Sequence, residues 1–253
     1  MSGSNGAAPD APLYPGEKPV GPPGARTPVA LLETRLGYGR YAPTGDAVRF
    51  TLNGREIEAR ADETILQAAA REGVEIPHLC YMAGMRPDGN CRACMVEVEG
   101  ERVLVASCSR RPMPGMNVRT DSDRALHSQR MVLELLVNDA PQPPNLDTEL
   151  GHWAARLGVS AGRFPMRPQP APDLSHPGMQ VHLESCIQCT RCVRACREVQ
   201  VNDVIGYANR GNAAKIVFDF DDPMGESTCV GCGECVQACP TGALLPSLSL
   251  LAR

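Results

Sequence analysis

The sequence predicts an α+β fold in consecutive parts: a small mixed domain at residues 46–120, a helical connector at 121–163 and a cysteine-rich domain at 164–253. Two observations predict this division. A strand–turn–strand–helix pattern opens the first part. The twelve cysteines fall into three groups of four, one group in the first part and two in the last. The chain is therefore expected to be organised around its cysteines.

Composition narrows the class of protein. The formal net charge of −4 gives no reason to expect a nucleic-acid partner. Aromatic residues make up only 4% of the chain, so the apolar core is modest and bound metal is expected to contribute to folding. We find no apolar run of about eighteen residues, no signal peptide and no N-terminal twin-arginine segment. We therefore expect no membrane span and a cytoplasmic, reducing location.

Residues 1–45 are predicted to form a flexible arm. Seven prolines between positions 9 and 28, with many glycines and alanines, leave little to bury in a core. The arm either is disordered or lies along a partner subunit.

The first folded part has the pattern of a β-grasp domain. Residues 48–52 alternate as a strand, Asn53-Gly54 predicts a hairpin turn, and residues 56–60 form the returning strand. A helix is expected from Asp62, as its capping residue, to Arg71, with Gly73 closing it. Three apolar residues of this helix share the face toward the sheet: Ile65, Leu66 and Ala69.

Four cysteines follow this helix with the spacing C-x10-C-x2-C-x13-C: Cys80, Cys91, Cys94 and Cys108. Four thiolates in a loop over a β-grasp sheet suit a [2Fe–2S] cluster, although the first gap is longer than in plant-type ferredoxins. His78 lies two residues before Cys80. A histidine-ligated cluster needs two histidines and two cysteines, so we expect His78 not to be a ligand.

The connector is predicted to be helical over residues 123–136. Apolar residues recur there at helical spacing: Leu126, Met131, Val132, Leu135 and Leu136. Trp153 and Leu157 are expected to pack the connector against a neighbour, and His127 and His152 to be surface or packing residues.

The last part contains two runs with the spacing C-x2-C-x2-C-x3-C, which is typical of a bacterial two-[4Fe–4S] ferredoxin. Strands are expected at residues 180–184, 201–207 and 215–220. In that arrangement three cysteines of a run hold one cluster and the fourth, at the start of the following helix, reaches the other. One cluster is then assigned to Cys186, Cys189, Cys192 and Cys239. The other is assigned to Cys196, Cys229, Cys232 and Cys235.

Two alternatives remain open for these residues. Structural zinc also uses C-x2-C pairs, but normally with a longer gap between pairs than these runs have. Disulfides are disfavoured because the cysteines are crowded and no secretion signal is found. Arg191, Arg194 and Arg197 form a charged patch beside the first run, which is either a solvated face or a docking site for a redox partner.

Two segments of the first part resemble the large iron–sulfur subunit of respiratory complex I: residues 76–81 and 89–100. In those relatives the chain after the connector helix holds a further [4Fe–4S] cluster through one histidine and three cysteines. Here no cysteine lies between Cys108 and Cys186, so that site is expected to be lost.

The last part resembles a narrower group, the N-terminal iron–sulfur portion of the alpha subunit of NAD-linked molybdenum or tungsten formate dehydrogenases. The resemblance rests on residues 171–178, 196–206 and 214–225. It implies a hetero-oligomer in which this chain relays electrons between a molybdopterin (Mo or W) subunit and a flavin/NAD-binding subunit. No pterin site or nucleotide-binding motif is found here, so no catalytic residue is assigned and the chain alone is not expected to oxidise formate.

Two other functions are weighed against this one. The chain could be the corresponding iron–sulfur diaphorase subunit of an NAD-reducing hydrogenase or another complex I-like assembly. It could also be a non-redox scaffold whose metals only stabilise the fold, although one cluster would suffice for that purpose.

Overall fold

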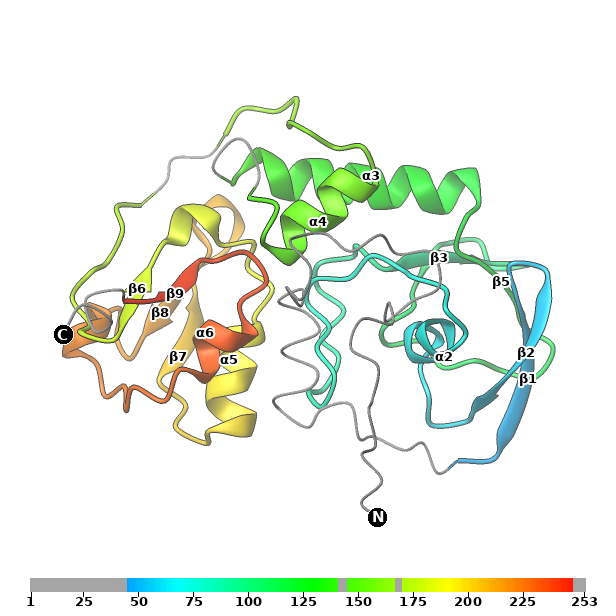
Figure 1. Cartoon of the computed structure of the whole chain (residues 1–253), viewed down its shortest axis with the longest axis horizontal. Helices are drawn as coiled ribbons and strands as arrows, with labels where there is room; N and C mark the ends of the chain where they lie inside the picture. Colours follow the sequence, from blue (N-terminus) through cyan, green and yellow to red (C-terminus); the bar gives the residue numbers. More distant parts are fainter. Residues whose placement is uncertain (1–44, 141–144, 167–169, 248–253) are drawn as a thin grey trace, which may run out of the picture.

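The computed structural model describes residues 45–140, 145–166 and 170–247. The predicted arm lies outside the described residues except for its last position. Figure 1 shows two α+β halves side by side, with the connector helices α3 and α4 along the top of both. Within the described residues no helix has the length and apolar character needed to cross a bilayer.

The first half is a five-stranded mixed sheet with the strand order β2-β1-β5-β3-β4. Its strands are β1 (Ala47–Leu52), β2 (Arg55–Arg60), β3 (Met95–Val98), β4 (Val105–Ala106) and β5 (Asn117–Arg119). The β1–β5 pair is parallel and the other three pairs are antiparallel. The predicted hairpin turn is confirmed, because Asn53 and Gly54 both adopt positive φ, at 50° and 80°.

Helix α2 (Ile65–Arg71) packs on this sheet and begins later than predicted. Its capping residue is Thr64, not Asp62, because Thr64 and Gln67 exchange the two hydrogen bonds of a capping box. The predicted inner face is confirmed, since Ile65, Leu66 and Ala69 are all buried. They join Phe50 and Val96 in one hydrophobic core.

The connector contains α3 (Asp123–Asn138) and α4 (Glu149–Arg156). The helix predicted over residues 123–136 is confirmed as α3. Four of its residues at four-residue spacing are buried: Ala125, Gln129, Leu133 and Val137. Of the apolar residues that predicted the helix, Leu135 is 48% exposed. Trp153 packs with Leu133 and with Leu79 of the first half, and Leu157 packs against the same cluster, as predicted.

The second half is built from two small two-stranded antiparallel sheets and short helices. Its strands are β6 (Met179–Val181), β7 (Ile205–Ala208), β8 (Lys215–Phe218) and β9 (Leu244–Pro246), paired β6–β9 and β7–β8. Its helical segments are η2 (Leu183–Ser185), α5 (Arg191–Arg194), η3 (Ala195–Val199), η4 (Gly211–Ala213), η5 (Met224–Glu226) and α6 (Glu234–Ala238).

The predicted strands of this half are correct in part. The strand expected over 201–207 begins only at Ile205, because Val201 and Asp203 adopt positive φ, which strands do not use. The strand expected over 215–220 ends at Phe218, before Asp219 turns to a φ of 46°. The strand expected over 180–184 gives way to η2 at Leu183.

Candidate iron–sulfur cluster sites

The first cysteine set is brought together by the long segment between α2 and β5. Cys80 follows the buried Ile76 and Leu79, and Cys94 directly precedes β3. Ser107 fixes the last cysteine by hydrogen bonding to the Cys94 carbonyl through both its backbone N–H (3.1 Å) and its hydroxyl (2.8 Å). The segment thus folds back so that Cys108 faces Cys94.

The four thiols of this set are close enough to hydrogen bond to one another. Cys108 and Cys91 donate to Cys80, which lowers the pKa of the Cys80 thiol to about 2. A hydrogen bond from Cys108 likewise lowers the pKa of Cys94. The backbone N–H of Cys80 also points at the sulfur of Cys91, 3.4 Å away. Sulfurs that receive N–H and S–H donors are stabilised as thiolates, the form that binds iron.

The imidazole of His78 contacts a backbone carbonyl and two aromatic rings. Its Nδ1 lies 2.8 Å from the Ile76 carbonyl, and its ring contacts the rings of Tyr81 and Trp153 at centroid distances of 5.7 and 5.9 Å. Burial lowers its pKa. A neutral imidazole packed between aromatic rings is a structural part of the domain interface.

The two cysteine runs of the second half share one local geometry. In each, the first two cysteines lie in a turn and the third lies in a short helix, α5 or α6. The fourth cysteine was expected at the start of the following helix, but Cys196 lies in η3 and Cys239 caps the end of α6. Each fourth cysteine therefore lies beyond the other three cysteines of its run, on the side toward the other run.

The sulfurs group across the two runs. One cavity is lined by Cys186, Cys189, Cys192 and Cys239, together with apolar side chains such as Ile216 and Leu244. Burial, reinforced by the neighbouring thiols, raises the pKa of Cys192 well above its ordinary value. Such desolvated thiols need a cationic centre to become thiolates, as an iron–sulfur cluster provides.

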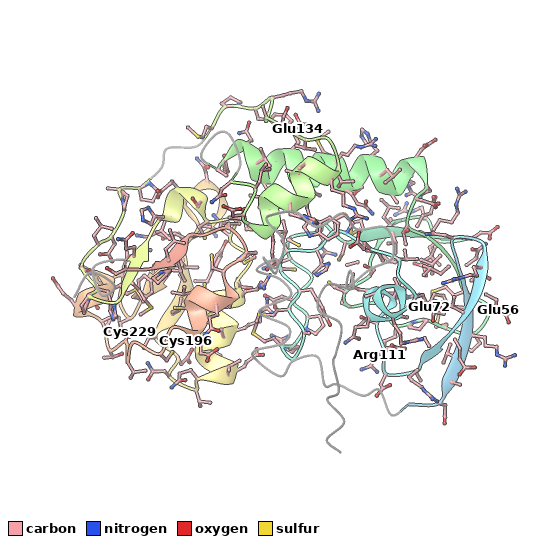
Figure 2. The ribbon with its side chains drawn as sticks, in the orientation of Figure 1. Glu56, Glu72, Arg111, Glu134, Cys196 and Cys229 are labelled. Carbon is pink, nitrogen blue, oxygen red and sulfur yellow. The ribbon has the colours of Figure 1, made fainter. Side chains whose placement is uncertain are left out.

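The other set is formed by Cys196 of the first run and three cysteines of the second run: Cys229, Cys232 and Cys235. Cys196 is close to Cys229 and Cys235, and Figure 2 shows Cys196 and Cys229 near each other. Burial raises the pKa of Cys235 to about 12, while Cys232 is exposed. The N–H of Gly231 points at the sulfur of Cys229 at 3.4 Å. This set has one side open to solvent.

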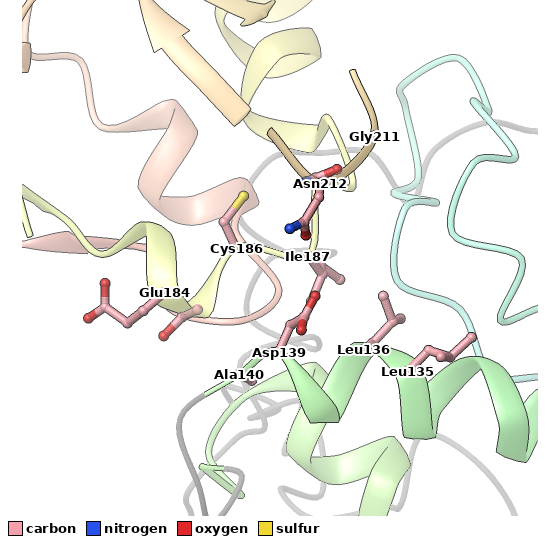
Figure 3. A pocket seen from close by; sticks show the side chains of 11 residues that line it. Leu135, Leu136, Asp139, Ala140, Glu184, Cys186, Ile187, Gly211 and Asn212 are labelled. Atoms are coloured by element: carbon pink, nitrogen blue, oxygen red, sulfur yellow. The ribbon is translucent and has the colours of Figure 1, made fainter. Parts of the chain in front are cut away.

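A pocket of about 350 Å³ opens beside the first run. Figure 3 shows that it lies between the end of α3, with Leu136 and Asp139, and the segment of Glu184 and Cys186. The set of Cys186, Cys189, Cys192 and Cys239 is called the enclosed set below, because its members line one cavity. Cys186 of this set also lines the pocket.

Two arginines of the first run tie the halves together, which neither interpretation of the charged patch anticipated. Arg191 and Arg194 are only 3% and 4% exposed, whereas Arg197 is exposed and pairs with Asp203. Arg191 Nη1 donates to both carboxylate oxygens of Glu149 in α4, at 2.9 and 2.8 Å, and to the Leu79 carbonyl at 3.2 Å. Arg191 and Arg194 are three residues apart, which places them on one helix face. The sequence does not show which residues cover that face.

The donor sets fit iron–sulfur clusters in number and chemistry. Each has four thiols, and in each a backbone N–H donates to a sulfur. Among the described residues, no three Cys, His, Asp or Glu side chains are grouped to hold a single metal ion.

Comparison with known families agrees with this chemistry. Residues 45–123 match a 2Fe-2S iron-sulfur cluster binding domain. Residues 176–245 match the ferredoxin-like domain of NADH-quinone oxidoreductase subunit 3. The predicted fold, a [2Fe–2S] ferredoxin domain followed by a [4Fe–4S] ferredoxin-like domain, is thereby confirmed.

Individual relatives match most of the chain. It is 35% identical over 208 residues to NADP-reducing hydrogenase subunit HndD of Solidesulfovibrio fructosivorans, covering 77% of this chain and 35% of that protein. It is 33% identical to the mitochondrial NADH dehydrogenase [ubiquinone] iron-sulfur protein 1 of Solanum tuberosum, covering 79% and 27%. A chain in the crystal structure of NAD+-reducing [NiFe]-hydrogenase in the H2-reduced state superposes with a TM-score of 0.73 at 30% identity, covering 79% of this chain and 87% of that one.

The folds and thiol sets define an iron–sulfur protein with a [2Fe–2S] domain and a [4Fe–4S] ferredoxin-like domain. The chain belongs to the family of iron–sulfur electron-transfer subunits that NADH-quinone oxidoreductases and NAD-reducing hydrogenases share. It spans about a fifth to a third of the length of the curated relatives it matches.

Proposed function

We propose that this chain holds one [2Fe–2S] and two [4Fe–4S] clusters and relays single electrons within a hetero-oligomeric oxidoreductase. The [2Fe–2S] cluster is assigned to Cys80, Cys91, Cys94 and Cys108. The [4Fe–4S] clusters are assigned to Cys186, Cys189, Cys192 and Cys239, and to Cys196, Cys229, Cys232 and Cys235. The observation that carries the proposal is that twelve thiols gather into three sets of four in adjoining domains.

The order of the sets supports a relay. The [2Fe–2S] loop and the first cysteine run meet in a buried interface, and the set that contains Cys196 and Cys229 exposes Cys232. Electrons would pass through the enclosed set and be exchanged with a partner at the exposed one. A scaffold role is disfavoured because a purely structural metal does not need three adjacent sites, one of them open to solvent.

The partners are proposed to be a flavin/NAD-binding subunit and a molybdopterin (Mo or W) subunit of the formate dehydrogenase type. The resemblance of residues 171–178, 196–206 and 214–225 to that group supports this choice. A second candidate is the iron–sulfur subunit of an NAD-reducing hydrogenase. The 30% identity to a chain of such an enzyme over 87% of its length favours that candidate.

Metal analysis tests the cluster assignment. Anaerobically reconstituted chain is expected to contain about ten iron atoms and an equal amount of acid-labile sulfide, since the three clusters need all twelve thiols. A reproducible value of about fourteen iron atoms would require a further cluster, and zinc in place of iron would restore the structural interpretation.

The catalytic partner is tested by purifying the complex from the source cells through a tag on this chain. Formate-dependent NAD reduction with bound molybdenum or tungsten supports the first candidate. Hydrogen-dependent NAD reduction with bound nickel supports the second. A complex with neither metal contradicts both.

A further inference from the structure

Arg194 lies between the loop of the first cysteine set and the first cysteine run, and it is almost completely buried. It belongs to α5, in the second half of the molecule. Its guanidinium hydrogen bonds to backbone carbonyls in the loop of residues 80–88 of the first half. A charge that cannot be neutralised is thus held in the interface between two proposed clusters.

The contacts of this guanidinium reach one ligand residue on each side. Nη2 donates to the carbonyl oxygen of Cys80 at 2.5 Å and makes a longer contact of 3.5 Å with that of Cys189. Nη1 donates to the Arg86 carbonyl at 2.8 Å. One planar group therefore fixes the backbone of a proposed [2Fe–2S] ligand relative to that of a proposed [4Fe–4S] ligand.

Neighbouring side chains hold the same junction. Asp88 Oδ2 lies 3.8 Å from Arg194 Nε and accepts a hydrogen bond of 2.5 Å from the Thr190 hydroxyl. Asn90 donates to the same hydroxyl at 3.2 Å and to the Gln188 carbonyl at 3.4 Å. The loop of the first set is thus bonded to both sides of Cys189.

Arg194 differs from Arg191 in how its charge is compensated. Arg191 is paired at 2.8 Å with the equally buried Glu149. The acidic neighbour of Arg194 is 3.8 Å away and its side chain is 26% exposed, so water screens it. More of the positive field of Arg194 therefore acts on its surroundings, where it stabilises an added electron.

We propose that Arg194 is a positioning residue for electron exchange between the [2Fe–2S] cluster and the enclosed [4Fe–4S] cluster, and that its charge raises their reduction potentials. The inference rests on the proposed function. The exchange moves one electron between the two ligand sets, oxidising one cluster as the other is reduced, and needs no proton or co-reactant. Its rate falls steeply with separation, which the guanidinium fixes.

Two variants of the full, reconstituted chain separate position from charge. Arg194→Gln removes the charge, and Arg194→Lys keeps it but lacks the planar fork that reaches two carbonyls. Redox titrations followed by EPR report the potentials, and spin–spin broadening of the signals in fully reduced protein reports the separation. Arg197→Gln, on an exposed cation three residues away, is the control and is expected to change neither.

Arg194→Gln is expected to lower the reduced-to-oxidised ratio of at least one of the two clusters about tenfold at fixed potential, or about 59 mV for a one-electron couple. Arg194→Lys is expected to keep the native reduction potentials and to lose the spin–spin broadening of the EPR signals. Native potentials and native broadening in both variants would overturn the inference. If Arg194→Gln does not retain its clusters, the spin–spin broadening measured for Arg194→Lys tests the inference by itself. An unaltered chain without cluster signals would instead refute the proposed function.

Discussion

Gln188 and Thr190 adopt a left-handed backbone at the positions that glycine fills in the second cysteine run. Their φ values are 58° and 60°, against 70° and 80° for Gly231 and Gly233. Non-glycine residues tolerate this region only when the surroundings support it. Here Gln188 donates to the Ala214 carbonyl at 2.7 Å and Thr190 bonds to Asp88. The first run thus uses side chains that also attach it to its neighbours, whereas the second run has glycine at both positions.

Cys91→Ala tests the ligand set of the first domain. We expect the variant to lose the [2Fe–2S] EPR signal and to keep both [4Fe–4S] signals, because its thiol interacts with that of Cys80 in the first cysteine set. EPR of the reduced protein is the measurement. Survival of all three signals would show that Cys91 is not a ligand.

Crossed ligation is tested by comparing variants in pairs. Cys196→Ala and Cys229→Ala are expected to lose the same [4Fe–4S] signal, although the two residues lie in different runs. Cys239→Ala and Cys186→Ala should both lose the other signal, because these residues line one cavity. If Cys196→Ala and Cys186→Ala instead lost the same [4Fe–4S] signal, each run would ligate its own cluster.

At the scale of elements, the ion pair between α4 and α5 joins the connector to the first cysteine run. Removing one partner of a buried pair leaves an uncompensated charge, so Glu149→Ala is expected to lower the free energy of unfolding by about 3–5 kcal/mol. Urea unfolding of the reconstituted chain measures it. The double variant Glu149→Leu/Arg191→Met, which leaves no charge, should recover much of that loss.

Glu134→Ala is the matched control for this prediction. Glu134 is also a glutamate on a connector helix paired with an arginine, but its partner Arg163 is 68% exposed, as is typical of surface pairs. Its change in unfolding free energy should be much smaller. Equal effects of Glu149→Ala and Glu134→Ala would mean that the buried pair does not hold the elements together.

The sequence predicted those features of the elements that local patterns encode. The Asn53-Gly54 turn and the inner face of α2 depend on neighbouring residues and were correct. The start of α2 was wrong because Asp62 and Thr64 are both good capping residues and only the bond to Gln67 decides between them. The burial of Arg191 and Arg194 could not be predicted, since it depends on carbonyls more than a hundred residues away.

Over the whole molecule, the cysteine sets and the domain interface form one continuous structure. Leu79, next to the proposed ligand Cys80, packs with Leu133 of α3 and Trp153 of α4. Met82 and Met85 pack against Ala195 and Ala238, which adjoin the proposed ligands Cys196 and Cys239. Because these proposed ligands adjoin the packed interface, a change in domain orientation would alter the separation of the proposed clusters. The packed interface would therefore keep the separation of the proposed clusters constant.

That arrangement predicts what the whole chain does alone and with partners. The isolated, reconstituted chain is expected to show no formate oxidation and no NADH oxidation with artificial acceptors, because its chemistry-bearing side chains are thiols gathered to hold clusters. Added to the proposed flavin and catalytic partners, it should restore electron flow between them. Cys91→Ala protein is the control: it should bind the partners and retain both [4Fe–4S] clusters yet transfer electrons far more slowly. Turnover by the isolated chain, or native transfer by the Cys91→Ala protein, would mean that electrons do not follow the proposed series of clusters.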